Sequence, residues 1–485
     1  MRLCARAPLV WPQFRSNVAF ETTLGDRRAT EKAFAKAARV VTLDLVNQRL
    51  IANYLDTRAV VAEYDAGANR LTLTLSSQGS HLARDVLGND VLRIAPETLR
   101  VFTPDVGGGF GAKLFPYREY ALAAVAARKL ARPVVWIAER GEHFLADAQG
   151  RDNITRAKLA LEEDGRFLAL DVDLVADMGA YLSFFAPPIP FIGAEMLPGV
   201  YDIAACHIRI RGAYTNTVPV DAYRGAGRPE AAYVIERLVD AAVRELSMEP
   251  NALRRRNFIK PNAMPYTTAT RKVYDSGEFA GHLKQAQEAA DWKGFRRRLA
   301  ASRKAGRRRG IGMATYIEAC GSNGPDTATV RLEREGSITV LIGSQSTGQG
   351  HHTAYAQIVA EHLGLPADHV RIVQGDTDAI ASGPVHAGTT HRLSRRKWTI
   401  AGPNWCRASL ILRNKRLLST VTKIYSTVST TMKLWCSPMP CIRRTKRGRP
   451  AVGRPRTRKS RLKGPADGNA RTFTGRLIWK RAPPA

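Results

Sequence analysis

Two distant stretches of this sequence share one plan. Leu71 to Asp105 reads LTLTLSSQGSHLARDVLGNDVLRIAPETLRVFTPD, and Ile338 to Asp376 reads ITVLIGSQSTGQGHHTAYAQIVAEHLGLPADHVRIVQGD. They align once four residues, the TGQG region, are inserted into the second copy. Each predicts a strand, a polar Gly-rich loop, a helix, a turn and a second strand. The matched positions are Gln78 with Gln345, His81 with His352, Leu92 with Leu363, Leu99 with Val370, and Asp105 with Asp376.

This repeat predicts two related subdomains whose ligand loops face a shared cleft. The period is too long, and the copies too few, for a solenoid. The fold class that we expect is α+β with mixed sheets. Three helices are predicted between the copies. The first spans Arg118 to Arg132, with Leu122, Val125, Ala126 and Leu130 on one face; the second starts at Pro229, with Ile235, Leu238, Val239, Ala242 and Leu246 on one stripe; the third runs from about Glu278 to Phe295.

The repeat breaks near Pro384, and the composition changes at the same place. Residues 385–485 hold 25 Lys and Arg against one acid, Asp467, so most of the formal net charge of +31 belongs to them. Residues 1–384 carry only +7. The second subdomain is therefore expected to be incomplete, and residues 385–485 to form a basic, disordered tail. The predicted domains are 12–262, 263–384 and this tail.

Cysteine usage and hydropathy narrow the class of protein. The six cysteines are scattered and form no CxxC pair, so no disulfide framework, zinc site or iron–sulfur site is indicated. No stretch approaches the ~20 apolar residues that a membrane span needs. The N-terminus is too short and too broken for a secretory signal. These features predict a cytoplasmic protein without a membrane span.

Two Gly-rich loops occupy matching places after the repeated strands. GGGFGAK at Gly107 to Lys113 lets backbone N–H groups approach an anion closely. STGQGHH at Ser346 to His352 places the Gln349 amide, which both donates and accepts, between two glycines. Its adjacent histidines would point apart on a helix and make a poor metal pair. A tight strand–helix turn explains the first loop equally well, and a capping turn the second.

A third loop carries two arginines around two glycines. Asp221 to Glu230 reads DAYRGAGRPE and precedes a predicted helix. An arginine on such a loop can fork onto a carboxylate or a phosphate. The alternative is an ordinary ion pair with acids on neighbouring strands.

Taken in order, these motifs resemble one family. SSQ ending at Gln78, GGGFGAK, AYRGAGRPEA, RRNFI at Arg255 to Ile259, TGQGH and QGDTD are similar to the xanthine dehydrogenase/aldehyde oxidase family. The likeness is greatest to its molybdopterin-binding large subunits of the carbon monoxide dehydrogenase-like type. It covers about residues 12–383, as if the family's sequence were truncated at both ends.

The resemblance implies a molybdenum ion held by a molybdopterin, expected as the cytosine dinucleotide, between the two subdomains. It implies oxidative hydroxylation of a small-molecule substrate with water as the oxygen source. FAD and [2Fe–2S] clusters are then expected on a medium and a small partner subunit, in a dimerised heterotrimer.

The resemblance also assigns residues by position. No protein side chain is expected to bind the metal directly. The residues expected on the molybdenum side are Gln78, Gly108, Gly109, Phe110 and Gly111. Those expected on the pterin side are Gln349, Gly350 and His351. On the substrate loop, Arg224 would orient a substrate carbonyl, with Gly225 and Ala226 beside it.

Two departures qualify these expectations. Gly225 stands where carbon monoxide dehydrogenases carry a copper-holding cysteine, so an aldehyde or an N-heterocycle is the expected substrate. The family's catalytic glutamate lies in a GExG-like segment near the C-terminus, and residues 385–485 contain no glutamate. Loss of a general base typically costs ~10²–10⁴-fold in rate, so we expect impaired turnover.

Two explanations of the tail stay open. A frameshift near Pro384 in GC-rich coding sequence would produce many Arg, Pro and Ala codons. Alternatively, KRGRP at Lys446 to Pro450 and GRPR at Gly453 to Arg456 resemble AT-hook cores, which enter the DNA minor groove. The second explanation predicts a nucleic-acid-associating protein.

Overall fold

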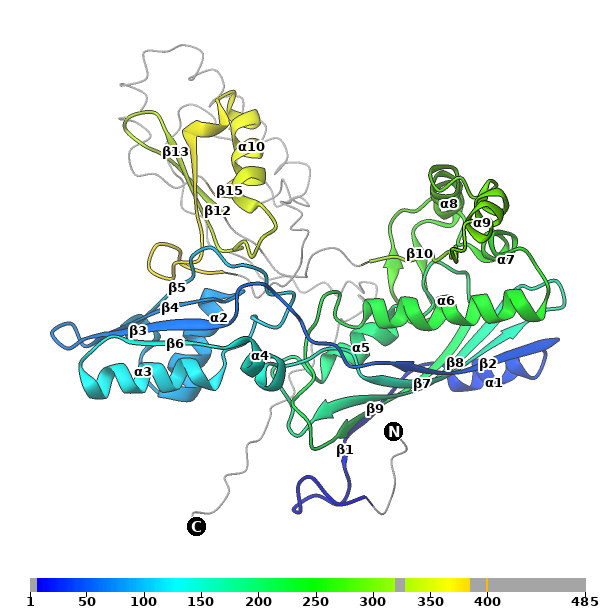
Figure 1. Ribbon diagram of the computed structural model, residues 1–485, viewed down its shortest axis with the longest axis horizontal. Helices are drawn as coiled ribbons and strands as arrows, with labels where there is room; N and C mark the ends of the chain where they lie inside the picture. The colour runs from blue at the N-terminus through cyan, green and yellow to red at the C-terminus, as the bar shows by residue number, and fades with distance from the viewer. Residues whose placement is uncertain (1–6, 319–327, 384–397, 400–485) are drawn as a thin grey trace, which may run out of the picture. The chain divides into compact units, whose positions relative to one another are not determined.

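The computed structural model describes residues 7–318 and 328–383 and the backbone of 398–399. These residues form three mixed sheets and a two-stranded hairpin, joined by helices (Figure 1). Parallel pairs such as β8–β9 and β4–β5 lie beside antiparallel ones. The predicted α+β class with mixed sheets is confirmed. Of the predicted tail, the structure describes only the backbone of 398–399, which pairs with strand β12 and is therefore ordered, contrary to the prediction. The rest of the tail lies outside the described residues.

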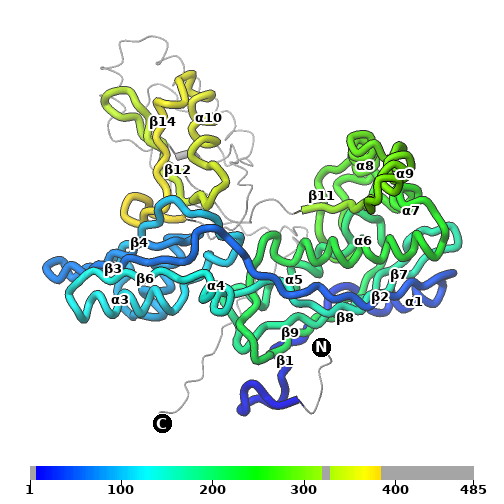
Figure 2. Tube along the Cα trace, in the orientation of Figure 1, coloured from blue at the N-terminus to red at the C-terminus, as the bar shows by residue number. Residues whose placement is uncertain are grey.

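The largest sheet has five strands in the order β1-β9-β8-β7-β2. Helix α6 covers one face of it, and α1 contacts β8 and β9 (Figure 2). The smaller helices of this part are α5, α7, α8 and α9. The bounds are β1 Val18–Gly25, α1 Arg27–Phe34, β2 Arg39–Asn47, β7 Asn153–Leu161, β8 Phe167–Gly179, α5 Pro188–Glu195, β9 Ala205–Tyr214, α6 Arg228–Glu245, α7 Pro250–Asn257, α8 Phe279–Ala289 and α9 Phe295–Lys304.

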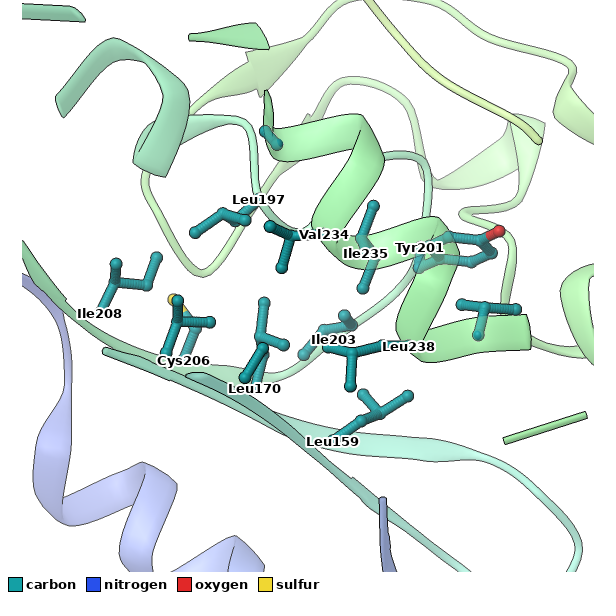
Figure 3. Close-up of a cluster of buried hydrophobic side chains, with 14 of the residues drawn as sticks. Leu159, Leu170, Leu197, Tyr201, Ile203, Cys206, Ile208, Val234, Ile235 and Leu238 are labelled. Atoms are coloured by element: carbon teal, nitrogen blue, oxygen red, sulfur yellow. The ribbon is translucent and has the colours of Figure 1, made fainter. Parts of the chain in front are cut away.

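The main hydrophobic core lies between α6 and this sheet. The predicted apolar stripe of α6 is confirmed, since Ile235, Leu238 and Val239 are fully buried there. They pack against strand residues such as Leu170 and Ile208 (Figure 3). Full burial of one such side chain stabilises the fold by about 1.5–3 kcal/mol. This core holds α6, and with it the Arg224 loop that precedes it.

The predicted repeat appears as two sheets that share the arrangement of three strands and differ in the fourth, which is antiparallel in the first sheet and parallel in the second. In the first, β3 and β4 form a hairpin and β5 lies parallel to β4, with Leu71 opposite Leu99. In the second, β12 and β13 form a hairpin and β14 lies parallel to β13, with Ile338 opposite Val370. Their orders are β5-β4-β3-β6 and β14-β13-β12-β15. The bounds are β3 Ala59–Asp65, β4 Arg70–Leu75, β5 Leu99–Phe102, β6 Val134–Ile137, β12 Ala328–Leu332, β13 Ile338–Ile342, β14 Val370–Val373 and β15 Trp398–Thr399.

The helices of the two copies also match. The first is α2, continued by a π-helical turn, η1; the second is α10. Each begins after a glycine, Gly79 or Gly350, and each ends at a left-handed residue, Arg93 or Gly364. A short 3₁₀ turn, η2 or η4, precedes the following strand. The bounds are α2 Ser80–Asp85, η1 Val86–Leu92, η2 Pro96–Thr98, α10 His351–Leu363 and η4 Ala367–His369. The alignment of the repeat is therefore confirmed through both helices.

The two copies are linked along their last strands. Phe102 bridges to Asp376, and the guanidinium of Arg100 forks onto the Asp376 carboxylate at 3.1 and 2.7 Å. The backbone of Val101 exchanges hydrogen bonds with the Thr377 N–H and hydroxyl. This contact joins the last strands of the two copies.

Two predicted helices differ from the structure. Helix α3 runs over Arg118–Leu130, but its buried face is Tyr120, Ala123, Ala124 and Ala127. Leu122 and Leu130, which we placed on the apolar face, are 65% and 63% exposed. Small alanines allow the close approach of the helix to β3, and this packing outweighs side-chain size.

The helix predicted over Glu278 to Phe295 is divided into α8 and α9. Asp291 adopts a left-handed conformation, with φ 44°, and its carboxylate accepts a hydrogen bond from the Gly294 N–H. A residue in this conformation ends an α-helix. The remaining elements are α4 Arg140–Ala146, η3 Pro261–Ala263, β10 Tyr266–Thr267 and β11 Val273–Tyr274.

The link between the copies should weaken in acid. Burial alone would raise the pKa of Asp376, but hydrogen bonds from Arg100 and from the backbone N–H of Asp378 outweigh it and hold the pKa below its usual value. Because the pKa of Asp376 is lower in the folded than in the unfolded protein, the carboxylate contributes its full stability above the pKa of the unfolded protein, about 3.9. That contribution is lost as the pH falls through the pKa of the folded protein.

We therefore expect Asp376→Asn to lower the free energy of unfolding by roughly 1 kcal/mol at pH 7. The difference from the parent protein should close below about pH 4. Urea denaturation at several pH values measures both quantities. Asp44→Asn, at a pair whose carboxylate is 72% exposed, is the control. A difference that persists unchanged to pH 3 would contradict the role given to the carboxylate.

Candidate functional site

The GGGFGAK loop closes over the side chain of Gln78. The Oε1 atom of Gln78 accepts hydrogen bonds from the backbone N–H groups of Gly111, at 2.8 Å, and Lys113, at 3.2 Å. Since the amide oxygen is thus fixed, the amide nitrogen is the free end, and no described residue accepts a hydrogen bond from it. A Cβ on Gly109 would lie 2.4 Å from Oε1, so only glycine fits there without displacing the amide.

Lys113 anchors this loop from behind. Its ammonium is buried and donates to the Asp56 carbonyl at 2.6 Å, the Asp56 carboxylate at 2.9 Å and the Ser76 hydroxyl at 2.6 Å. It also lies 4.4 Å from the centre of the Tyr54 ring. Burial lowers the pKa of Lys113, and Asp56 opposes that shift.

In the structure, the backbone N–H groups of Gly111 and Lys113 are not available to an anion. The Gly111 and Lys113 N–H groups are already bound to Gln78, and the Lys113 ammonium faces inward. The next helix, α3, begins five residues later, at Arg118. The glycines serve close packing around an amide instead.

The arginine loop lies directly against the GGGFGAK loop. The Arg224 N–H donates to the Phe110 carbonyl at 2.8 Å, and the Arg224 guanidinium lies 5.4 Å from the Phe110 ring centre. Gly111 approaches the Ala222 carbonyl so closely that a Cβ would be 2.5 Å from it. Phe110 is 42% exposed and Arg224 is exposed as well. An aromatic ring and a cation thus stand together on one open face.

Both loops depend on left-handed backbone. Phe110 and Ala226 have φ values of 52° and 47°, and Gly225 and Gly227 have 91° and 90°. For residues with a Cβ this conformation costs energy, and it concentrates at functional sites.

The second Gly-rich loop is closed by its own amide. The Oε1 atom of Gln349 accepts from the Thr347 N–H and hydroxyl, so its amide nitrogen also becomes the outward end. A Cβ on Gly348 or Gly350 would meet nothing within 4 Å. His351 is buried and stacks on Tyr355 at 4.9 Å, whereas His352 is exposed. The expectation that these histidines point apart is confirmed.

Gln345, at the root of the second loop, contacts the first copy. Its Oε1 atom accepts from the Ser80 N–H at 3.1 Å and hydroxyl at 2.7 Å, and its nitrogen donates to the Ser77 carbonyl at 2.7 Å. Thus the structure brings Gln78, Gly109 and Gly111 together, and Phe110 with Arg224. It records no contact of Gln349 with Phe110 or Arg224 among the described residues.

Sequence reasoning missed three functional supports. Lys113 stood inside a recognised motif, but its role as an anchor was not visible. Gln345 was paired with Gln78 in the repeat, and that pairing could have raised the question of its partner. Arg151, which contacts the arginine loop, has no local motif at all. The RRNFI motif is structural: Asn257 accepts from the Phe167 N–H and donates to the Gly165 carbonyl.

Comparison with protein families gives two matches, one to each half of the described chain. The model of a molybdopterin cofactor-binding domain matches residues 10–258, and a second model of that description matches residues 285–393. These matches define a protein built from molybdopterin cofactor-binding domains.

Similar proteins narrow the class. The chain is 34% identical to the carbon monoxide dehydrogenase large chain of Hydrogenophaga pseudoflava over 85% of its length and 52% of the relative's. It is 32% identical to the nicotine 6-hydroxylase large subunit of Paenarthrobacter nicotinovorans, over 79% of this chain and 48% of that relative. The crystal structure of quinoline 2-oxidoreductase from Pseudomonas putida 86 matches with a TM-score of 0.72 and 32% identity, over 76% of this chain and 49% of that one.

The chain belongs to the xanthine dehydrogenase/aldehyde oxidase family, as a molybdopterin-binding large subunit of the carbon monoxide dehydrogenase-like type. This family consists of molybdopterin-dependent oxidoreductases. The chain spans about half the length of the curated relatives it matches. Among the described residues, no helix is long and apolar enough to cross a membrane.

The Lys113 anchor should contribute measurably to stability. Lys113→Met removes three charge-assisted hydrogen bonds, and we expect the free energy of unfolding to fall by about 1.5–3 kcal/mol. Lys158→Met is the matched control, because that ammonium is 42% exposed and pairs with Asp171 at 3.4 Å. Its loss should cost under about 1 kcal/mol. Equal urea midpoints for the two variants would refute the anchoring role.

Proposed function

We propose that this chain binds molybdopterin, expected as the cytosine dinucleotide, and serves as the large subunit of a molybdenum hydroxylase. The observation that supports this most is the fixed Gln78 amide. Its oxygen is held by two backbone N–H groups, and its nitrogen is free to donate to an electron-rich ligand. Gly109 lies against that amide with no room for a Cβ. A donor held in a tight glycine cradle suits the oxygen-rich surroundings of a molybdenum centre.

Three sets of residues then take separate roles. Gln78 and the stretch from Gly108 to Gly111, including Phe110, face the molybdenum side. Arg224, with Gly225 and Ala226 beside it, faces the substrate and orients its carbonyl, because a cation beside a developing oxyanion stabilises charge where it forms. Gln349, Gly350 and His351 stand on the pterin side. When bound, the molybdenum centre supplies two-electron oxidation with oxygen that derives from water.

The substrate class that we propose is an aldehyde or an N-heterocycle. Gly225 has no thiol to hold copper, and its φ of 91° disfavours a side chain at this place. A nicotine hydroxylase subunit and a quinoline oxidoreductase, both named for N-heterocycles, are about as similar to the chain as carbon monoxide dehydrogenase is.

We further propose a heterotrimer, itself dimerised, in which a medium subunit carries FAD and a small subunit carries [2Fe–2S] clusters. Relatives named as large subunits, or as subunit gamma of a complex, support this. The bounds that we propose for the two subdomains are 12–262 and, for a partial second one, 263–384. Residues 385–485 hold no glutamate, so the family's general base is absent from them and we expect impaired turnover. A cytoplasmic location, a frameshift origin of the tail and its binding of nucleic acid stay predictions.

Metal and pterin content test the proposed function directly. The full chain, produced in a host that makes molybdopterin cytosine dinucleotide, should retain close to one molybdenum and one pterin per chain. Elemental analysis and the fluorescence of the oxidised pterin measure these. A purified, folded chain that holds neither would overturn the proposal.

Gly109→Ala should abolish most of this retention. The new Cβ would displace the Gln78 amide from the Gly111 and Lys113 N–H groups, so the donor would no longer be aimed. Gly141→Ala is the matched control, because a Cβ there meets nothing within 4 Å. Equal molybdenum content in the two folded variants would show that the Gln78 cradle is not part of the cofactor site.

A further inference from the structure

Arg151 lies beneath the arginine loop and binds its backbone. One guanidinium nitrogen donates to the Tyr223 carbonyl at 3.0 Å, and another donates to the Arg224 carbonyl at 2.6 Å. The guanidinium also lies 4.7 Å from the Tyr223 ring centre. Two consecutive carbonyls of the loop are thus turned toward one buried cation.

Glu230 holds this cation from the other side. Its Oε1 atom accepts from Arg151 at 3.0 Å, and both side chains are less than one tenth exposed. Glu230 lies in the first turn of α6, two residues after Arg228. The guanidinium therefore ties the loop to the helix that follows it, in a geometry that lysine cannot reproduce, because lysine has no planar fork.

The backbone around Arg151 is strained in a way that aims this side chain. Arg151 and Asp152 are consecutive left-handed residues, with φ values of 67° and 66°. Single left-handed residues with a Cβ cost about 1–2 kcal/mol each. The neighbouring contacts hold them there: Asp152 receives the Arg49 guanidinium at 2.6 Å, and Gly150 pairs with Leu50.

Gly150 completes the arrangement. A Cβ on Gly150 would lie 2.3 Å from the Tyr223 Cβ, so the two loops are in direct contact. The Tyr223 carbonyl and the Arg224 N–H belong to one planar trans peptide unit and point to opposite sides of it. Fixing the Tyr223 carbonyl therefore also fixes the Arg224 N–H, which donates to the Phe110 carbonyl.

We propose that Arg151 is a positioning residue that holds Tyr223 to Gly227 in the one shape that sets Arg224 beside Phe110. Its relevance to substrate rests on the proposed function of Arg224. The holding of the loop does not, because it follows from contacts within the chain.

Hydrogen–deuterium exchange of the full chain, read by mass spectrometry, tests this. Arg151→Gly removes the guanidinium and suits the left-handed backbone, so the loss of the side chain is measured without added strain. We expect amides in 222–228 to exchange roughly ten- to a hundred-fold faster, as the loss of charged hydrogen bonds implies. Peptides from 234–243 in α6 and from β8 should be unchanged. The control for loss of an arginine is Arg209→Met, which removes an exposed ion pair with Glu21. It is compared with Arg151→Met, because a glycine at Arg209 would itself weaken the strand that contains it.

Two further measurements separate positioning from general stability. Ethylguanidinium at non-denaturing millimolar concentration should restore protection of 222–228 in Arg151→Gly and have no effect on the parent protein. Arg151→Lys should lie between Arg151→Met and the parent. Unchanged exchange at 222–228 in Arg151→Gly would overturn the proposal, and so would equal acceleration across α6 and β8. Molybdenum content is measured in a separate experiment. A chain that binds no molybdenum would therefore refute the proposed function without changing the exchange result for Arg151.

Discussion

The site depends on the orientation of a single amide. Gln78 can turn its oxygen or its nitrogen outward, and the two choices present opposite chemistry to a ligand. The N–H groups of Gly111 and Lys113 decide the matter, because both are donors and both meet the oxygen. The loop can reach the amide only because Gly109 lacks a Cβ, and it stays there because Lys113 is fastened to Asp56 and Ser76. The cradle, its anchor and its outward donor form one unit.

The duplicated plan explains why the two halves are not equivalent. Gln78 and Gln345 occupy the same place in the repeat, yet one presents a free amide nitrogen and the other uses both ends of its amide to join the copies. The four-residue insertion supplies the second copy with a new glutamine, Gln349, which turns its own nitrogen outward. The two strand–loop–helix units thus share one plan, and the difference in loop length leaves Gln345 joined to the first copy and adds Gln349 to the second loop.

The sequence predicted the repeat, the register of its strands and the stripe of α6, because these follow from hydrophobic periodicity. It failed on α3, where alanines face the sheet and Leu122 faces solvent, since periodicity alone cannot tell close packing from bulk. It located the Gly-rich loops but not the direction in which their hydrogen-bond donors point. That direction is set by contacts between residues far apart in the sequence. Gln78 meets Lys113 across 35 residues, and Arg151 meets Arg224 across 73. Neither pairing leaves a local pattern to read.

The distribution of left-handed residues shows where the chain gives up local stability. Among the described residues, ten that carry a Cβ adopt this conformation. Four of them, Phe110, Arg151, Asp152 and Ala226, lie in or directly beneath the two loops that meet at Arg224, and the other six lie elsewhere. Ordinary turns would use glycine or asparagine at such places. A cost of about 1–2 kcal/mol per residue persists only where neighbouring contacts over-determine the backbone. Here those contacts are the buried Arg151–Glu230 pair and the Arg49–Asp152 pair. The contacts of Arg151 and Asp152 therefore hold the backbone at this junction against its local preference, and this is the rigidity that the proposed role of Arg224 would need.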